Sequence, residues 1–281
     1  MQSRRFKNPM TFNLRGFTLL ELMVVMAVIG MLVALLLPAV QSMRESARTL
    51  QCKNQMHQIG LALHSFESQQ QSLPAGNDAA NDFQHSWCTR ILPYLDQASL
   101  YHRYDWSKPW NDTSVAPGGS NFDVTHRNVI VFNCPSEPSP VSGETDYGGN
   151  LGTVATGLPI GFCYGDGWDA GALTFINFPC PQQRKHPVRF GDISDGLSQT
   201  FLIFEIAGRL TEGARWGSGG NCLGIQNAVN NKVFGETISS FHNQGGHALF
   251  GDGRVSFISE NADLQTLTYL ATRSGGEVAE Y

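Results

Sequence analysis

The feature that most constrains this chain is an apolar segment near its beginning that contains a single carboxylate. Residues 22–37 have no polar side chain, and the apolar character extends over residues 17–40, interrupted only by Thr18 and Glu21. A helix of these 24 residues is long enough to cross a lipid bilayer. A carboxylate in lipid costs roughly 2.5–3.5 kcal/mol near the bilayer centre and less near an end, so Glu21 requires an explanation.

Basic residues before this segment predict its orientation. Arg4, Arg5, Lys7 and Arg15 lie within residues 1–16, which contain no acidic residue. The positive-inside rule therefore predicts a cytoplasmic N-terminus and a body on the other side of the membrane. That body has 15 basic and 24 acidic residues, a net charge of −9. An acidic body disfavours nucleic acid as a partner.

Two simple interpretations of the segment are a secretory signal peptide and an uncleaved membrane anchor. A signal peptide has a shorter apolar core and small residues at its cleavage site, and the sequence LLLPAVQS at residues 35–42 fits that site poorly. An uncleaved anchor fits the length of the segment, but it leaves Glu21 without a role.

A third interpretation comes from the sequence RGFTLLE at residues 15–21, which resembles the class III signal of type IV prepilins and type II secretion pseudopilins. The resemblance implies that a prepilin peptidase/methyltransferase cuts between Gly16 and Phe17 and methylates the new amino group of Phe17. It also implies that Glu21 pairs with the terminal amine of a neighbouring pilin or pseudopilin subunit. Such a pair makes a carboxylate in lipid tolerable, because a partner charge neutralises it.

The helix is expected to continue past the apolar segment, with Pro38 loosening it locally. Residues 41–69 contain no proline, and one helical face is apolar. From residue 17 to residue 69 the helix would be roughly 80 Å long. Its second half would pack against a globular head through a stripe made of Cys52, Met56, Ile59, Leu63 and Phe66.

Cysteine usage gives a hypothesis about how the helix is fixed to the head. The chain has six cysteines and no C-x-x-C pair, which is compatible with disulfides outside the cytoplasm. Cys52 lies on the apolar stripe, and Cys134 ends an expected strand over residues 128–133. We expect a Cys52–Cys134 disulfide, worth about 4–5 kcal/mol in the chain-entropy model, with two buried free thiols as the alternative. The sequence leaves the pairing of four cysteines open: Cys88, Cys163, Cys180 and Cys222.

The remaining patterns predict an α+β fold, with the long helix on an antiparallel β-sheet head that carries extra short helices and Gly-rich loops. Helical signal returns over residues 86–104, where Pro93 starts or kinks a helix. A strand is expected over residues 200–206, and a hairpin turns at residues 251–253. A closing helix over residues 262–272 would be capped by Asn261.

Several longer stretches resemble one particular prepilin-like family of uncharacterised function, whose C-terminal signature is His, nine residues, then Asp-Gly. They include QCKNQMHQIGLALHSF, FNCPSEP, ISDGLSQTFLIFE and FHNQGGHALFGDGRVSFIS. In this chain the signature is His242 followed by Asp252 and Gly253. The resemblance spans about residues 15–277, and it implies an architecture more firmly than a biochemical role.

The chemistry-bearing residues give weak signals by themselves. His242, His247 and Asp252 are candidates for one metal site near the hairpin, and the resemblance to type II secretion pseudopilins implies calcium ligation by Asp252, or by Asp192 with Asp195. A tight turn also requires an Asp-Gly pair, His242 can hydrogen-bond a loop backbone, and the EF-hand spacing is absent, so we expect no cofactor. Four tryptophans lie in or beside expected loops and are candidates for a carbohydrate platform, with packing on the head as the alternative: Trp106, Trp110, Trp168 and Trp216. No nucleophile–base set with the spacing of a known hydrolase motif is visible, so an enzyme is not expected.

The sequence thus predicts three parts: a cleaved leader at residues 1–16, a long helix at residues 17–69, and an extracytoplasmic head at residues 70–281. Residues 17–40 of the helix would be the transmembrane and assembly part. The expected role is a pseudopilin-like subunit, held in the inner membrane by a single span and assembled into a pilus or pseudopilus. The alternative is an anchored surface protein whose head captures a ligand such as polysaccharide and never polymerises.

Overall fold

A computed structural model describes residues 17–80, 83–114, 119–153, 170–177, 186–209, 214–231 and 237–276. It divides the chain into two compact units, residues 1–46 and residues 47–281. Helix α1, Leu19–Gln70, begins in the first unit and ends in the second.

From residue 22 to residue 40, α1 is apolar all round and its side chains are exposed. The large apolar side chains from Phe17 to Val40 are between 44% and 78% exposed. The helix is unbroken at Pro38, so the local loosening expected there does not end or interrupt it. By length and composition, α1 is a candidate membrane span close to the N-terminus.

A capping box starts this helix. The carboxylate of Glu21 accepts hydrogen bonds from the backbone N–H and the hydroxyl of Thr18, both at 2.8 Å, and the Glu21 N–H donates to the Thr18 hydroxyl at 3.2 Å. This reciprocal pattern satisfies N–H groups that have no partner within a helix. Glu21 therefore has a local structural role that the sequence analysis did not assign, although the T-x-x-E spacing at residues 18–21 signals it.

In the second unit, the remainder of α1 packs on the head through the predicted stripe. Cys52, Met56, Ile59 and Leu63 are fully buried, and Phe66 is partly buried against the same core. The side chain of Gln55 adds a polar contact with the head: its amide oxygen accepts a hydrogen bond from the Tyr147 hydroxyl at 3.0 Å. The predicted helix and its buried face are confirmed.

The head is built on a five-stranded sheet with the strand order β6 (Cys222–Ile225), β3 (Tyr147–Thr153), β5 (Phe201–Glu205), β7 (Gly245–Phe250) and β8 (Val255–Ser259). Neighbouring strands are antiparallel except for β3 and β6, which run parallel, so the sheet is mixed where a wholly antiparallel sheet was expected. A second, three-stranded sheet has the order β2-β1-β4. The α+β fold class is confirmed.

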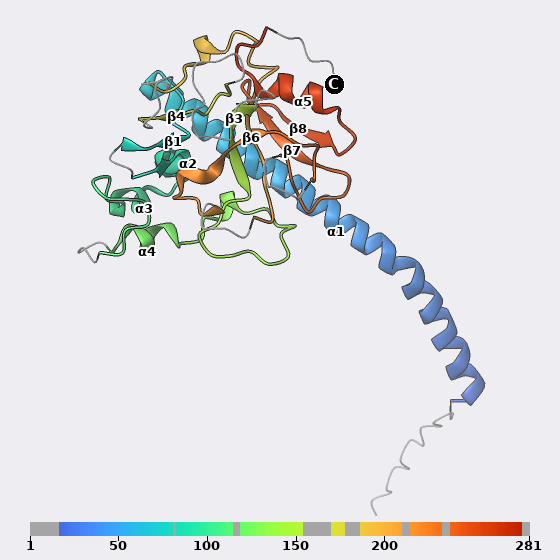
Figure 1. Ribbon diagram of the computed structural model, residues 1–281. Helices are drawn as coiled ribbons and strands as arrows, with labels where there is room; N and C mark the ends of the chain where they lie inside the picture. Colours follow the sequence, from blue (N-terminus) through green and yellow to red (C-terminus); the bar gives the residue numbers. More distant parts are fainter. Residues whose placement is uncertain are drawn as a thin grey trace, which may run out of the picture. The chain divides into compact units, whose positions relative to one another are not determined.

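The side chains of the central strand β5 are divided between two buried faces of the large sheet, and a register shift between Phe201 and Ile203 interrupts their alternation. On β5, Leu202 and Ile203 join the core that contains the buried stripe of α1, whereas Phe201 and Phe204 join a second core. That second core lies under the C-terminal helix α5 and includes Leu267. Figure 1 shows α1 passing behind the strands and α5 lying on their near side. The second unit therefore has three layers, helix, sheet and helix.

The C-terminal hairpin forms as predicted. Strands β7 and β8 pair antiparallel about the turn at residues 251–253, where Gly253 has a positive φ of 87°. The Gly253 N–H closes the turn on the Phe250 carbonyl at 3.0 Å. Helix α5 follows, but Asp263 caps it through a 3.0 Å bond from the Thr266 N–H. The expected Asn261 cap is wrong by two positions.

Two further expectations are corrected. Residues 130–132 form a short 3₁₀ helix, η3, in place of the expected strand at residues 128–133. The helical signal over residues 86–104 divides into α2, a 3₁₀ turn and α3. Pro93 stands at the start of that 3₁₀ turn, where its missing N–H costs nothing, and Asp96 ends the turn in a left-handed conformation.

The helices and strands, with η marking 3₁₀ helices, have the following bounds: α1 Leu19–Gln70, β1 Asn77–Asp78, β2 His85–Ser86, α2 Trp87–Ile91, η2 Leu92–Leu95, α3 Ala98–Arg103, α4 Asn121–Thr125, η3 Ile130–Phe132, β3 Tyr147–Thr153, β4 Phe175–Ile176, η4 Phe190–Asp192, β5 Phe201–Glu205, η6 Gly219–Asn221, β6 Cys222–Ile225, β7 Gly245–Phe250, β8 Val255–Ser259 and α5 Leu264–Ala271.

The buried stripe of α1 makes a prediction about stability. Leu63→Ala removes a fully buried side chain and leaves a cavity, so we expect it to lower the free energy of unfolding by about 2–5 kcal/mol. Leu61→Ala is the matched control, because Leu61 lies two residues away on the same helix and is 58% exposed. Its expected cost is below about 0.5 kcal/mol. Denaturant unfolding of both variants measures the difference, and equal costs would contradict the assigned face.

Candidate functional site

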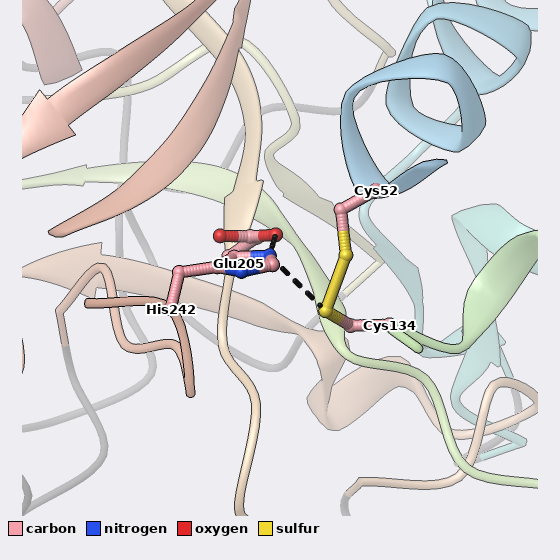
Figure 2. Close-up of side chains that lie close together, drawn as sticks. All are labelled: Cys52, Cys134, Glu205 and His242. Atoms are coloured by element: carbon pink, nitrogen blue, oxygen red, sulfur yellow. Dashed lines mark hydrogen bonds and ion pairs between the residues drawn. A yellow bond between two sulfur atoms is a disulfide. The ribbon is translucent and has the colours of Figure 1, made fainter. Parts of the chain in front are cut away.

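A disulfide between Cys52 and Cys134 lies at the centre of a buried polar cluster in the head. The two Cα atoms are 5.4 Å apart and the cysteines are separated by 82 positions in sequence. The predicted pairing is thus present, and it ties α1 to the loop that follows η3. Figure 2 shows the disulfide facing the side chains of Glu205 and His242.

Glu205 is the last residue of β5, and this position places its side chain beside the disulfide. Its backbone accepts a hydrogen bond from the Ser239 N–H at 2.9 Å, and a parallel bridge joins Ile206 to Ser239. These contacts hold the segment before β7 beside β5. His242 lies in that segment, so two residues distant in sequence meet at the disulfide.

The His242 ring makes contacts with both of its nitrogens. Nε2 lies 3.5 Å from Glu205 Oε1 and 3.4 Å from Cys134 Sγ. Nδ1 lies 3.2 Å from the Thr49 hydroxyl and 3.3 Å from the Ser136 hydroxyl. The ring is therefore fixed between α1, the Cys134 loop and the sheet.

A second histidine completes the environment of Glu205. The backbone N–H of His247 donates to Glu205 Oε2 at 2.7 Å, and His247 Nδ1 lies 3.3 Å from Oε1. Burial opposes ionisation of Glu205, but hydrogen bonds from His242 and His247 outweigh it and hold the pKa of that carboxyl below its usual range. Glu205 is thus a buried carboxylate held between two imidazoles.

A second buried acidic residue, Asp146, binds the backbone of the loop that contains Cys134. The Cys134 N–H donates to Asp146 Oδ2 at 2.6 Å. Burial nevertheless raises the pKa of Asp146 to about 7, and the negative charges of Glu137, Glu144 and Glu205 act in the same direction.

The order Ser136, His242, Glu205 repeats the hydroxyl–imidazole–carboxylate order of hydrolase triads. Two contacts distinguish it from such a triad. The Thr49 hydroxyl shares Nδ1 with Ser136, and Nε2 contacts Cys134 Sγ as well as the carboxylate. The arrangement is that of a shared hydrogen-bond network around a disulfide.

The two parts of the C-terminal signature lie apart. His242 precedes strand β7, whereas Asp252 and Gly253 follow it. The six residues of β7 span roughly 20 Å, so the two parts of the signature lie at opposite ends of the strand. Asp252 stabilises its own turn, because Oδ1 accepts from the Arg254 N–H at 2.9 Å. The signature therefore marks a buried histidine and a hairpin turn, not one joint site.

The other calcium candidates are engaged in local structure. Asp195 accepts hydrogen bonds from the N–H groups of Gly275 and Gly276 at 2.7 and 2.8 Å. Asp192 accepts from the Arg189 N–H at 3.0 Å and so caps η4. These carboxylates bind backbone donors near the C-terminus and at a helix start.

Three of the four tryptophans considered as a platform lie among the described residues, and they pack on the head. Trp216 is fully buried and Trp110 is nearly so. Trp106 lies against Tyr104 and under the guanidinium of Arg90, which is 5.0 Å from its ring. None of these three forms an open platform, and Trp168 lies outside the described residues.

The cysteines outside the disulfide divide into two groups. Cys88 and Cys222 are free and buried, and burial raises the pKa of both thiols, so both are held as neutral thiols. Cys163 and Cys180 lie outside the described residues, as does Gly16.

A shallow groove lies between β8 and α5, away from the cluster. Its volume is about 390 Å³, and its apolar lining includes Ile258, Leu267 and Leu270. The groove has the size of a small-ligand pocket, and sequence patterns gave no signal for it.

Two family comparisons match this chain. The family described as "Protein of unknown function (DUF1559)" matches residues 41–231, and the "Prokaryotic N-terminal methylation motif" matches residues 12–37. The motif covers the expected cleavage site and implies processing by a prepilin peptidase. The His242–Gly253 signature lies beyond the matched range. Neither a curated protein nor a solved structure matches the chain.

Asp146 predicts how the stability of the head depends on pH. A carboxyl whose pKa is about 7 when folded and about 3.9 when unfolded binds more protons in the folded state between these values, so stability falls as pH rises through that window. At about 1.4 kcal/mol per pH unit, the loss is roughly 4 kcal/mol. We expect Asp146→Asn to remove this slope and Glu260→Gln, at an exposed site, to retain it. Denaturant unfolding from about pH 4 to pH 7 measures both, and an unchanged slope in Asp146→Asn would exclude this assignment.

Proposed function

This chain belongs to the family described as "Protein of unknown function (DUF1559)" and carries a prokaryotic N-terminal methylation motif, and from that premise we propose that it is a pseudopilin-like structural subunit. Prepilin peptidase cleaves it after Gly16 and methylates Phe17. The mature chain is stored in the inner membrane through residues 17–40 and assembles into a type IV pilus or a type II secretion-type pseudopilus.

The single observation that carries the proposal is the coincidence of the methylation motif with an exposed apolar helix. The motif ends at residue 37, within the run of exposed Val, Leu, Ile and Met side chains of α1. An apolar helical surface of this extent needs lipid or other helices around it. A subunit that passes from membrane to filament meets both requirements in turn.

Glu21 supports the assembly step. Its carboxylate lies at the start of the apolar helix and accepts two hydrogen bonds from Thr18. An ionised carboxylate has acceptor sites beyond these two. Cleavage frees an amine at Phe17, and the Phe17 amine of a neighbouring subunit supplies the positive charge that Glu21 lacks within its own helix turn.

The proposal includes a topology and a division of the chain. The leader is residues 1–16, the long helix is residues 17–69, and residues 70–281 form the head in the periplasm or at the cell surface. The partners are prepilin peptidase/methyltransferase, other pilin or pseudopilin subunits and the membrane. We propose no enzymatic role and no nucleic-acid partner.

The groove between β8 and α5 favours a second candidate function, an anchored protein whose head captures a ligand without polymerising. The lining of Ile258, Leu267 and Leu270 suits an apolar ligand better than a polysaccharide. The two candidates differ in one observable: a subunit appears in sheared filaments, and an anchored binding protein remains dispersed in the membrane fraction.

Processing is tested at the cleavage site. Gly16→Ala is expected to block cleavage, so the chain retains residues 1–16 and an unmethylated N-terminus. Amino-terminal sequencing and intact mass measure the result. Gly30→Ala is the matched control, because a Cβ at Gly30 meets no atom within 4 Å and lies beyond the cleavage site. A Gly16→Ala chain that still begins at Phe17 would contradict the proposal.

Assembly is tested by separating the two roles of Glu21. Glu21→Ala removes both the capping box and the charge, whereas Thr18→Ala removes the capping hydroxyl and keeps the carboxylate. Loss of the cap costs about 0.5–2 kcal/mol of helix stability in either variant. We expect Glu21→Ala to abolish recovery in sheared filaments and Thr18→Ala to retain most of it. If both variants lose filament recovery equally, Glu21 acts only as a helix cap and the assembly role is contradicted.

A further inference from the structure

The buried cluster contains the donor atoms of a metal site as well as a disulfide. The sulfurs of Cys52 and Cys134, a carboxylate oxygen of Glu205 and a ring nitrogen of His242 all lie within 4.8 Å of one another. We propose that the reduced head binds one zinc-class divalent ion through these four side chains. The disulfide and the metal are then alternative occupants of one site, selected by redox state.

The distances suit a tetrahedral ion after a small movement. With Zn–S bonds near 2.3 Å and Zn–N and Zn–O bonds near 2.1 Å, tetrahedral ligand atoms stand roughly 3.4–3.8 Å apart. Separations within 4.8 Å therefore need to close by about 1 Å at most for the most distant pair, while the two sulfurs separate once their bond is broken.

The donor types select the ion. Two thiolates and an imidazole are soft or intermediate ligands that favour zinc and disfavour calcium and magnesium. Two thiolates, one carboxylate and a neutral imidazole carry a charge of −3, which a divalent cation reduces to −1. Four protein ligands without an open position indicate a structural ion and not a catalytic one.

The surrounding contacts are those that orient metal ligands. His242 directs Nε2 toward the sulfur and carboxylate, and its Nδ1 meets the hydroxyls of Thr49 and Ser136. A metal-binding histidine commonly donates its second N–H to such a partner, and a hydroxyl accepts as readily as it donates. The backbone N–H of His247 fixes Glu205 Oε2 in the same manner.

A disulfide alone does not account for these neighbours. Cys52, Glu205 and His242 are buried, and burying ionisable groups costs several kcal/mol unless partners compensate. An apolar lining would serve a covalent staple at lower cost. The side chains of Thr49 and Ser136 are only partly buried, so the site lies one side chain below the surface and is within reach of an ion.

The exchange balances in two steps. A dithiol reductant in the compartment of the head transfers two electrons and two protons to the sulfurs, and the S–S bond breaks as the dithiol becomes a disulfide. The ion then replaces the two thiol protons, which are released, and the single proton of the neutral His242 ring moves from Nε2 to Nδ1 by exchange with water. A disulfide oxidant reverses the exchange: it accepts two electrons and takes up two protons to become a dithiol, the two thiolates form the S–S bond, and the ion leaves.

The test uses the full chain in detergent, reduced with a phosphine that does not chelate metal, and titrated with Zn²⁺ alone. We expect one ion per reduced chain, up to two protons released per ion, and no stoichiometric binding by the oxidised chain. Substitution with Co²⁺ is expected to give the intense thiolate-to-metal absorption of a tetrahedral site. Circular dichroism of the reduced chain before and after zinc monitors folding.

Variants locate the site. Cys52→Ser and His242→Ala, each measured under reduction, are expected to lose the stoichiometric binding. Cys88→Ala is the matched control, because it removes a buried thiol outside the four ligands and is expected to leave affinity unchanged. A folded reduced chain without zinc affinity, a reduced chain that unfolds and is not refolded by zinc, or binding that survives in both ligand variants would each overturn the proposal.

Discussion

The covalent bond between Cys52 and Cys134 is the constraint around which the head is organised. It fixes the buried face of α1 against the Cys134 loop, and the same point gathers the end of β5 and the segment before β7. The apolar stripe of α1 includes four fully buried side chains, Cys52, Met56, Ile59 and Leu63, but apolar contact alone is non-directional. The disulfide and the contact between Thr49 and His242 add the directional part, because each joins one position of α1 to one position of the head.

The sequence predicts the elements whose pattern lies within one short segment, and it does not predict contacts between segments that are distant in sequence. The α1 stripe and the β7–β8 hairpin follow from periodicity and turn residues, and both are confirmed. The apolar run at residues 128–133 fails as a strand because short apolar runs fit a turn of helix equally well, and here η3 forms. The predicted cap of α5 is Asn261 and the observed cap is Asp263, because Asn and Asp are equally good N-cap residues and the sequence does not show at which of them the helix begins. The meeting of Glu205 with His242 has no local signal, since it depends on the pairing of strands distant in sequence.

Glu21 shows how one side chain can satisfy two requirements at different stages. In the isolated chain it completes a capping box with Thr18, which stabilises the first turn of a helix whose described side chains are exposed there. In the proposed filament the same carboxylate meets an amine from another subunit. The capping hydrogen bonds hold the Glu21 carboxylate at the start of the helix, oriented toward the N-terminus. The same side chain therefore stabilises the helix and is available for the proposed assembly contact.

The sequence separation of the disulfide has a mechanical consequence. A force applied along the chain between the N-terminal helix and the sheet passes through the S–S bond, so the 82 positions between Cys52 and Cys134 carry no tension. Fully extended, that interval would measure about 280 Å. A filament or anchor made from such subunits therefore resists elongation at this point until a covalent bond is cleaved, and its extensibility becomes a property of the local redox environment.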